Sequence, residues 1–176
     1  MAASKAKDFP DGIGGRNLQR AGGLRLSWYR TLALGAFLLI AIFGIFGGAP
    51  TESRKVVSDA AELSVHVPHP IRNGMFLEWR IEVLARQPVE DAVIAIPENL
   101  WKDMTINSLI PAATEEEFKD GEFRFHFGPL EPGDRLLFKI DGQVNPPNFE
   151  RHRGAIRVLD RDRQLAASPV ALRVIP

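Results

Sequence analysis

Apolar and polar residues alternate one by one over much of the chain after residue 60. The alternation is clearest from Met75 to Ala85, where every odd-numbered position is apolar and Glu78, Arg80 and Glu82 stand between. A period of two places successive side chains on opposite faces of a β-strand. The same reasoning predicts strands over 63–67, 89–96, 115–119, 122–127 and 136–144, a weaker one over 104–110, and one or two closing strands within 155–159 and 165–174.

Turn signals separate these segments. Asp120-Gly121 is typical of a two-residue hairpin turn, and residues 128–134 and 160–162 form further turns. Trp101 lies in a turn or short helix before the weaker strand. Seven or eight short strands without a long helix between them favour an antiparallel β-sandwich, since parallel strands would need crossover helices. The expected core consists of Leu63, Val65, Leu77, Trp79, Ile81, Val83, Val93, Phe123, Phe125, Leu136, Phe138 and Ile140.

An uncharged stretch from Thr31 to Thr51 precedes the predicted sandwich. Its apolar part, 31–48, spans roughly 27 Å as a helix, which is close to the hydrocarbon thickness of a bilayer. We therefore expect a single transmembrane helix over 31–48. A cleaved signal peptide is the alternative, but the basic region before the span is longer than such a peptide has, and Pro50 follows the small-residue site at 47–49.

Charge is distributed unequally on the two sides of this span. The 22 basic and 22 acidic residues balance overall. Before the span the balance is +4, from six Lys/Arg and two Asp, so the remainder of the chain carries −4. The positive-inside rule predicts a basic, disordered cytoplasmic segment over 1–30, a linker over 49–60 and an extracytoplasmic domain over 61–176. This places the protein in the bacterial inner membrane with its C-terminal domain in the periplasm.

Small residues share one face of the expected transmembrane helix, namely Ala33, Ala41, Gly44 and Gly48. Such residues allow helix backbones to approach closely, so this face is a candidate helix–helix contact. Small residues are also common in transmembrane helices that make no such contact.

The segment Gly-Pro-Leu-Glu-Pro-Gly-Asp at 128–134 precedes a predicted strand. Together with the opening Val-His-Val-Pro and the later hairpin, it resembles bacterial immunoglobulin-like (CARDB-type) envelope modules, in which a Leu-x-Pro-Gly turn precedes a late strand; Leu130, Pro132 and Gly133 match it. The whole chain is similar to bacterial single-pass membrane proteins of unassigned function with one such domain. The resemblance implies an immunoglobulin-like fold and a binding or scaffolding role.

Motifs for catalysis are absent from the sequence: it has no cysteine, no Gly-x-Ser-x-Gly, no phosphate-binding loop and no His-Glu-x-x-His. We expect no enzymatic activity and no cofactor. A metal site using His66 and His69, with His126 or His152, would suit zinc or copper, but the strand spacing separates the first two. These histidines are better interpreted as solvent-facing strand residues, so we predict no metal site.

Acidic residues cluster at 115–117 with Asp120, and again at Asp160 and Asp162. Calcium needs several convergent oxygens, which a linear run on alternating faces rarely provides. We interpret the first cluster as charge that protects an edge strand from association, and the second pair as turn residues.

A stiff, basic segment is the candidate interaction surface. It combines prolines, amides and arginines, and its candidate residues are Gln143, Asn145, Phe149, Arg151, Arg153 and Arg157. A solvated basic face is the alternative. The sequence leaves two functions open: a membrane-anchored, non-catalytic module that binds or stabilises another envelope protein, or a periplasmic sensor of a small ligand or metal. The expected partners are the bilayer and another membrane or envelope protein. The sequence is also compatible with a homo-oligomer. We expect no nucleic-acid partner, because the sequence has no recognition motif for one.

Overall fold

The computed structural model describes residues 28–43, 52–146 and 151–175. It divides into two compact units, with the boundary between residues 39 and 40.

The first unit contains most of helix α1 (Trp28–Ile42), whose side chains are exposed along almost its whole length. At its start the rings of Trp28 and Tyr29 meet edge to face, with centroids 6.5 Å apart. Ala33 and Ala41 belong to this helix, whereas Gly44 and Gly48 lie outside the described residues. Within the described part of the chain, no helix combines the length and the apolar character needed to cross a membrane.

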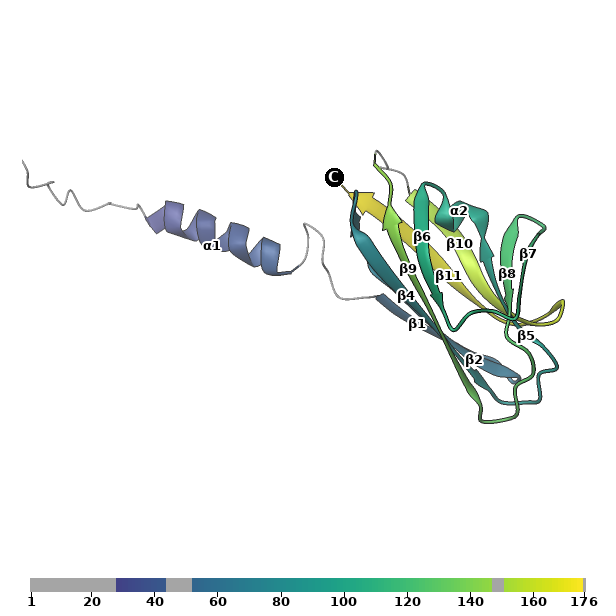
Figure 1. The fold of residues 1–176 in the computed structure, drawn as a ribbon. Helices are drawn as coiled ribbons and strands as arrows, with labels where there is room; N and C mark the ends of the chain where they lie inside the picture. Colours follow the sequence, from purple (N-terminus) through teal and green to yellow (C-terminus); the bar gives the residue numbers. More distant parts are fainter. Residues whose placement is uncertain (1–27, 44–51, 147–150, 176) are drawn as a thin grey trace, which may run out of the picture. The chain divides into compact units, whose positions relative to one another are not determined.

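The second unit is a mostly-β sandwich of two sheets (Figure 1). Its strands are β1 (Glu52–Val57), β2 (Ala61–Val67), β3 (Ile71–Arg72), β4 (Phe76–Ala85), β5 (Ala92–Pro97), β6 (Met104–Ile110), β7 (Glu115–Lys119), β8 (Glu122–His126), β9 (Arg135–Val144), β10 (Arg151–Asp160) and β11 (Arg163–Ile175). A short helix, α2 (Glu98–Trp101), connects β5 to β6.

The strand order sets which edges are free. The first sheet has the order β1-β2-β4-β9-β6, and the second has the order β3-β11-β10-β5-β8-β7. All pairings are antiparallel except that of β3 with β11, which is parallel. Strand β6 therefore ends one sheet and β7 ends the other.

The core fills the space between the sheets. Strand β2 buries every second residue, and Trp79, Ile81 and Phe138 are fully buried on the neighbouring strands. The second sheet contributes Ile94, Ile156 and other aliphatic side chains of β5, β10 and β11. At ~25 cal/mol per Å² of apolar area, this burial is the main term that stabilises the domain.

Two members of the expected core are placed differently. Phe123 is only partly buried against the core. Val93 is fully buried, but it belongs to a separate small cluster with Ala95 and Leu159. Strand β5 is apolar on both faces, so its period alone does not distinguish the inward residues, Ile94 and Ile96, from the outward ones.

The strand count was also underestimated, since the sandwich has eleven strands rather than seven or eight. Strand β1 lies within 49–60, the segment expected to be a linker, and β3 has only two residues. As an edge strand β1 buries no face against the core, so its sequence, Glu-Ser-Arg-Lys-Val-Val, lacks the apolar alternation that reveals a strand. The turn at Asp120-Gly121 is confirmed: both residues have positive φ, 54° and 77°, as a two-residue hairpin requires.

Candidate binding groove

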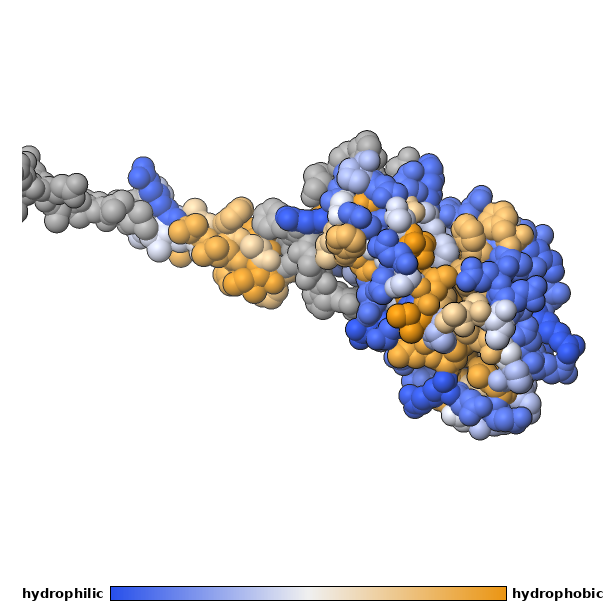
Figure 2. Space-filling model, viewed as in Figure 1, coloured by the Kyte–Doolittle hydropathy of each residue, from blue (hydrophilic) through white to orange (hydrophobic). Residues whose placement is uncertain are grey.

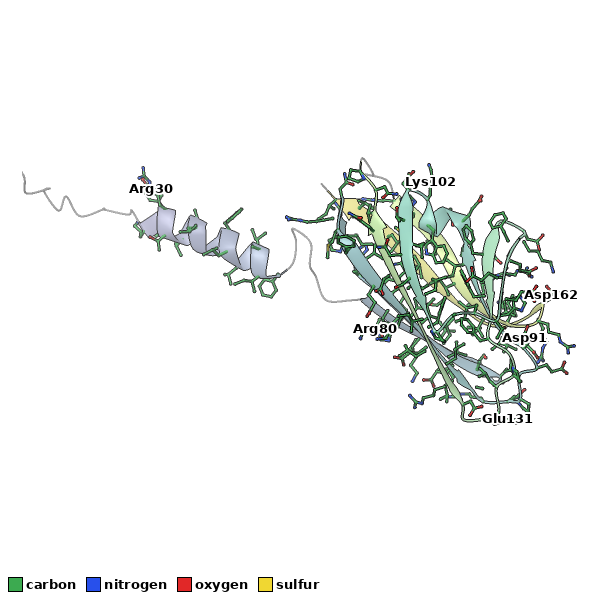
Figure 3. The ribbon with its side chains drawn as sticks, viewed as in Figure 1. Arg30, Arg80, Asp91, Lys102, Glu131 and Asp162 are labelled. Atoms are coloured by element: carbon green, nitrogen blue, oxygen red, sulfur yellow. The ribbon has the colours of Figure 1, made fainter. Side chains whose placement is uncertain are left out.

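A groove of about 1030 Å³ opens between the free edges of the two sheets. Strand β6 forms one wall, strand β7 the other, and α2 closes one end. The residues that line it are Glu98, Asn99, Trp101, Lys102, Met104, Ile106, Asn107, Ser108, Leu109, Glu116, Glu117, Phe118, Phe123 and Phe125. Figure 2 shows apolar surface gathered on the face of the domain that carries β6. Lys102, which follows α2, lies at the α2 end of the sandwich (Figure 3).

Aromatic rings form the floor of this groove. Trp101 lies against Phe123 and Phe125, with ring centroids 5.2 Å and 5.7 Å away, and against Trp79 at 6.3 Å in the core. Phe118 on β7 extends the cluster, 5.0 Å from Phe123, and its side chain is 56% exposed. Large apolar surface left open to water between two strands is typical of a binding site.

The local sequence explains why Trp101 reaches the floor. Pro97 precedes α2 with an extended backbone, and the Glu98 N–H donates to the Gly121 carbonyl of the hairpin turn. After one helical turn the chain reverses through Asp103, whose φ is +59°. The short helix thus places Trp101 between the sheets, 8% exposed, with its indole nitrogen unpartnered among the described residues.

The β6 wall is held by its contacts with β9. A β-bulge interrupts their register between Ile106 and Ser108. The Ser108 hydroxyl donates to an Asp141 carboxylate oxygen at 2.7 Å, and the Thr105 hydroxyl donates to the Asn145 side-chain oxygen at 3.1 Å. These bonds fix the strand whose apolar side chains face the groove.

The β7 wall carries charge on both faces. Glu116 and Phe118 face the groove because they pair with Phe125 and Phe123 of β8. Glu117 lies 3.6 Å from buried Arg124 on the outer face. The expectation that the acidic run belongs to an edge strand is confirmed.

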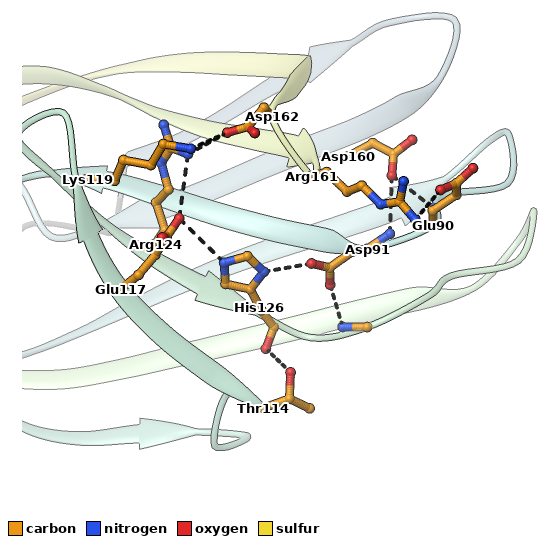
Figure 4. Close-up of polar contacts among 11 residues, drawn as sticks. Glu90, Asp91, Thr114, Glu117, Lys119, Arg124, His126, Asp160, Arg161 and Asp162 are labelled. Atoms are coloured by element: carbon orange, nitrogen blue, oxygen red, sulfur yellow. Dashed lines mark hydrogen bonds and ion pairs between the residues drawn. The ribbon is translucent and has the colours of Figure 1, made fainter.

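An ion-pair network covers the outer face of the hairpin (Figure 4). The buried guanidinium of Arg124 donates to Asp162 at 2.8 Å, and the Lys119 ammonium donates to the same carboxylate oxygen at 2.9 Å. The hydrogen bonds from Lys119 and then Arg124 lower the pKa of Asp162, and the bond to Asp162 raises the pKa of Lys119. The network secures the β7–β8 hairpin to the turn between β10 and β11.

His126 lies between two carboxylates beside this network. Its Nδ1 is 2.6 Å from Asp91 Oδ2, and its Nε2 is 3.7 Å from Glu117 (Figure 4). The other oxygen of Asp91 accepts the Gly128 N–H at 3.0 Å. The His126–Asp91 pair therefore connects the end of β8 to the residue that precedes β5.

The histidines are not brought together. His126 is engaged with Asp91, while His66 lies on β2 in the other sheet. Over the described ranges no group of three or more His, Asp or Glu side chains is arranged to hold a metal ion. The metal-sensing alternative therefore finds no support in the geometry of these residues.

The candidate interaction surface is divided between the two sheets. Gln143 lies on β9, where its amide donates to the Gly74 carbonyl, and Arg157 on β10 forms an ion pair with Glu122. Arg151 and Arg153 are exposed on β10. The remaining candidates are Asn145, which bonds Thr105, and Phe149, which lies outside the described residues.

One of these arginines adjoins the groove. The carbonyl of Arg153 accepts a hydrogen bond of 2.6 Å from the side chain of Asn99, which lines the groove in α2. The basic start of β10 therefore lies beside the α2 end of the groove. Sequence reasoning did not find the groove itself, because its aromatic residues resemble ordinary core positions until the open edges are known.

Comparisons with known proteins give distant structural similarities. No protein-family model matches the chain, and no curated protein matches its sequence. A chitin-binding domain of a chitinase from Pyrococcus furiosus is similar at 14% identity and a TM-score of 0.38, over 66% of this chain and 100% of that one. A non-cellulosomal cohesin from Archaeoglobus fulgidus is similar at 11% identity and a TM-score of 0.37, over 73% of this chain and 93% of that one.

Proposed function

We propose that this protein is a non-catalytic module that binds another envelope protein in the groove between β6 and β7. The observation that carries the proposal is the groove, with its floor of Trp101, Phe123 and Phe125. A sandwich needs no such opening for stability, since Phe118, which extends the floor and is 56% exposed, would be better buried. Water is released from this surface when a partner covers it, which favours binding.

We propose further that the module is of the immunoglobulin-like type and is anchored in the bacterial inner membrane by residues 31–48, with its β-domain in the periplasm. Support comes from the uncharged stretch and from the basic excess that precedes it. The basic segment around Arg151 and Arg153 would then extend the interaction surface beyond the α2 end of the groove, where Asn99 bonds the backbone of Arg153. An enzyme-reporter fusion after Pro176 that is active only in the cytoplasm would contradict this topology.

Affinity isolation in mild detergent tests the binding role. The tagged chain is expected to recover one dominant membrane protein from cells. Phe118→Lys should abolish that recovery, because it places a charge at the groove. Phe76→Lys is the matched control, since Phe76 is 67% exposed on β4, away from the groove, and Phe118 is 56% exposed. Recovery that is equal for both variants would contradict a binding site in the groove.

A further inference from the structure

The two free edges beside the groove differ in their protection. Strand β7 has the sequence Glu-Glu-Glu-Phe-Lys, whereas β6 has Met-Thr-Ile-Asn-Ser-Leu-Ile and no charge. Proteins commonly place charges on an edge strand to prevent another strand from pairing with it. Here one edge is protected in this way, while the edge opposite to it is not.

The unprotected edge also presents free backbone groups. The Asn145 N–H donates to the Asp103 carbonyl at 2.9 Å, so this pair is a hydrogen-bonded one. Hydrogen-bonded and non-hydrogen-bonded pairs alternate along an antiparallel ladder, so the next pair, Met104 with Val144, is not hydrogen-bonded. In agreement with this, the Val144 N–H donates to the Met75 carbonyl, on the side away from β6. The N–H and C=O groups of Met104 and Ile106 therefore point away from β9, to the open edge.

The apolar side chains of Met104 and Ile106 line the groove from the same strand. A segment that paired with this edge would place alternate side chains over Trp101 and Phe123. Seven residues of β6 extend over about 23 Å, which is enough to pair with a strand of similar length. The volume, about 1030 Å³, lies at the upper end of the range for small-molecule pockets.

We propose that the groove takes an extended polypeptide segment, which adds to β6 as a further strand and inserts apolar side chains onto the aromatic floor. This deepens the proposed function and depends on it. The groove also selects charge: its lining includes the carboxylates of Glu98 and Glu116 on the walls, against the single ammonium of Lys102 at the α2 end among the described lining residues. The preferred segment is therefore apolar at alternate positions and carries Lys or Arg at its other positions.

Amide hydrogen exchange in the full-length chain, held in mild detergent, tests this pairing. The probe is the synthetic peptide Lys-Val-Thr-Ile-Lys-Val-Thr-Ile-Lys. When it binds, exchange at the amides of Met104 and Ile106 is expected to slow by roughly tenfold or more, because each gains a hydrogen bond. The Thr105 amide is an internal control, since the alternation already directs it to β9.

Two further peptides separate pairing from other modes of binding. Methylation of alternate backbone nitrogens keeps the side chains but removes the donors, and is expected to weaken binding by roughly tenfold. Replacement of Lys by Glu is expected to weaken it as well. Three results would overturn the proposal: no binding of the unmodified peptide, equal binding of the methylated one, or slowed exchange at β7 and not at β6.

Two outcomes identify a different occupant. Slower exchange at Ile106 that depends on protein concentration without peptide would mean that a second copy of the chain fills the groove. Displacement of the peptide by detergent alone would mean that the groove prefers a lipid-like molecule. Either result overturns strand addition, whereas the loss of partner recovery in Phe118→Lys would still support the groove as a binding site.

Discussion

The ring centroids of Trp101 and Phe123 lie 5.2 Å apart, with the rings inclined at 32°, and this contact joins the four-residue helix α2 to the β7–β8 hairpin. This contact makes one continuous aromatic surface from the core to the open edge. Trp79 continues it inward and Phe118 continues it outward. The groove and the core are therefore parts of one packed structure, and changes to the floor should affect both stability and binding.

Replacement of Trp101 by Ala is expected to lower the free energy of unfolding by about 3–5 kcal/mol, because the cavity left beside Trp79 and Phe125 cannot collapse fully. Denaturant unfolding, followed by near-ultraviolet circular dichroism, measures the change. Phe76→Ala, at a residue 67% exposed, should change it by less than about 0.5 kcal/mol. Similar losses in the two variants would show that Trp101 is not part of the core.

Replacement of Asp91 by Ala should destabilise the domain by about 1–3 kcal/mol, since it removes acceptors from the Gly128 N–H and from the His126 ring. Glu90→Ala is the matched control on the adjacent residue. The Glu90 side chain forms an ion pair with exposed Arg161, so its loss is expected to cost less than about 1 kcal/mol. A cost for Glu90→Ala equal to that for Asp91→Ala would refute the structural role of the Asp91–His126 pair.

Asp160 gives the stability a dependence on pH. Burial alone would raise its pKa, but hydrogen bonds from Arg163 and from the N–H groups of Asp91 and Glu90 outweigh it, so the pKa lies below its ordinary value of 3.8. A lowered folded pKa contributes stability that is fully present above 3.8 and is lost as pH falls through the folded value.

Asp160→Asn is therefore expected to be less stable than the native chain at neutral pH, and the difference should narrow below about pH 3.8. Unfolding curves across this range measure the difference. If the difference in the free energy of unfolding between the two proteins stayed constant down to about pH 2, the ionised Asp160 carboxylate would not be the cause of that difference.

Gly142 holds β6 close to β9. A Cβ at this position would lie 2.9 Å from the Thr105 carbonyl oxygen, which is backbone and cannot move independently. Gly142→Ala should thus cost about 1–3 kcal/mol of stability through overpacking, and it should displace the groove wall. Amide chemical shifts of β6 report the displacement, and unchanged shifts together with unchanged stability would contradict it.

Much of the sandwich was predictable because its central strands have one buried and one exposed face. Strand β4 lies between β2 and β9, and all of its odd-numbered residues are buried. The hairpin turn at Asp120-Gly121 was equally accessible, because two positive φ angles in succession restrict the residue types strongly. Strand β1 could not be predicted in this way, since an edge strand needs no alternation of apolar and polar residues.

The groove could not be predicted from residues alone. Phe123 and Phe125 have the same spacing and chemistry and both line the groove, but Phe125 is 3% exposed and packs against Phe138 of the core, whereas Phe123 is only partly buried. The groove arises from strand order, which leaves β6 and β7 as terminal strands of the two sheets, and both strands line it. The one available signal was the uncharged segment 104–110 beside the acidic run 115–117.

Photo-crosslinking in living cells tests the central claim most directly. A photoreactive phenylalanine analogue replaces Phe118 in one variant and Phe76 in another, so that the two probes have similar exposure but only one lies in the groove. We predict a crosslink to one discrete protein from position 118 and none to that protein from position 76. Crosslinking of the same protein from position 76 alone, or from neither position, would contradict the groove as the place where the partner binds.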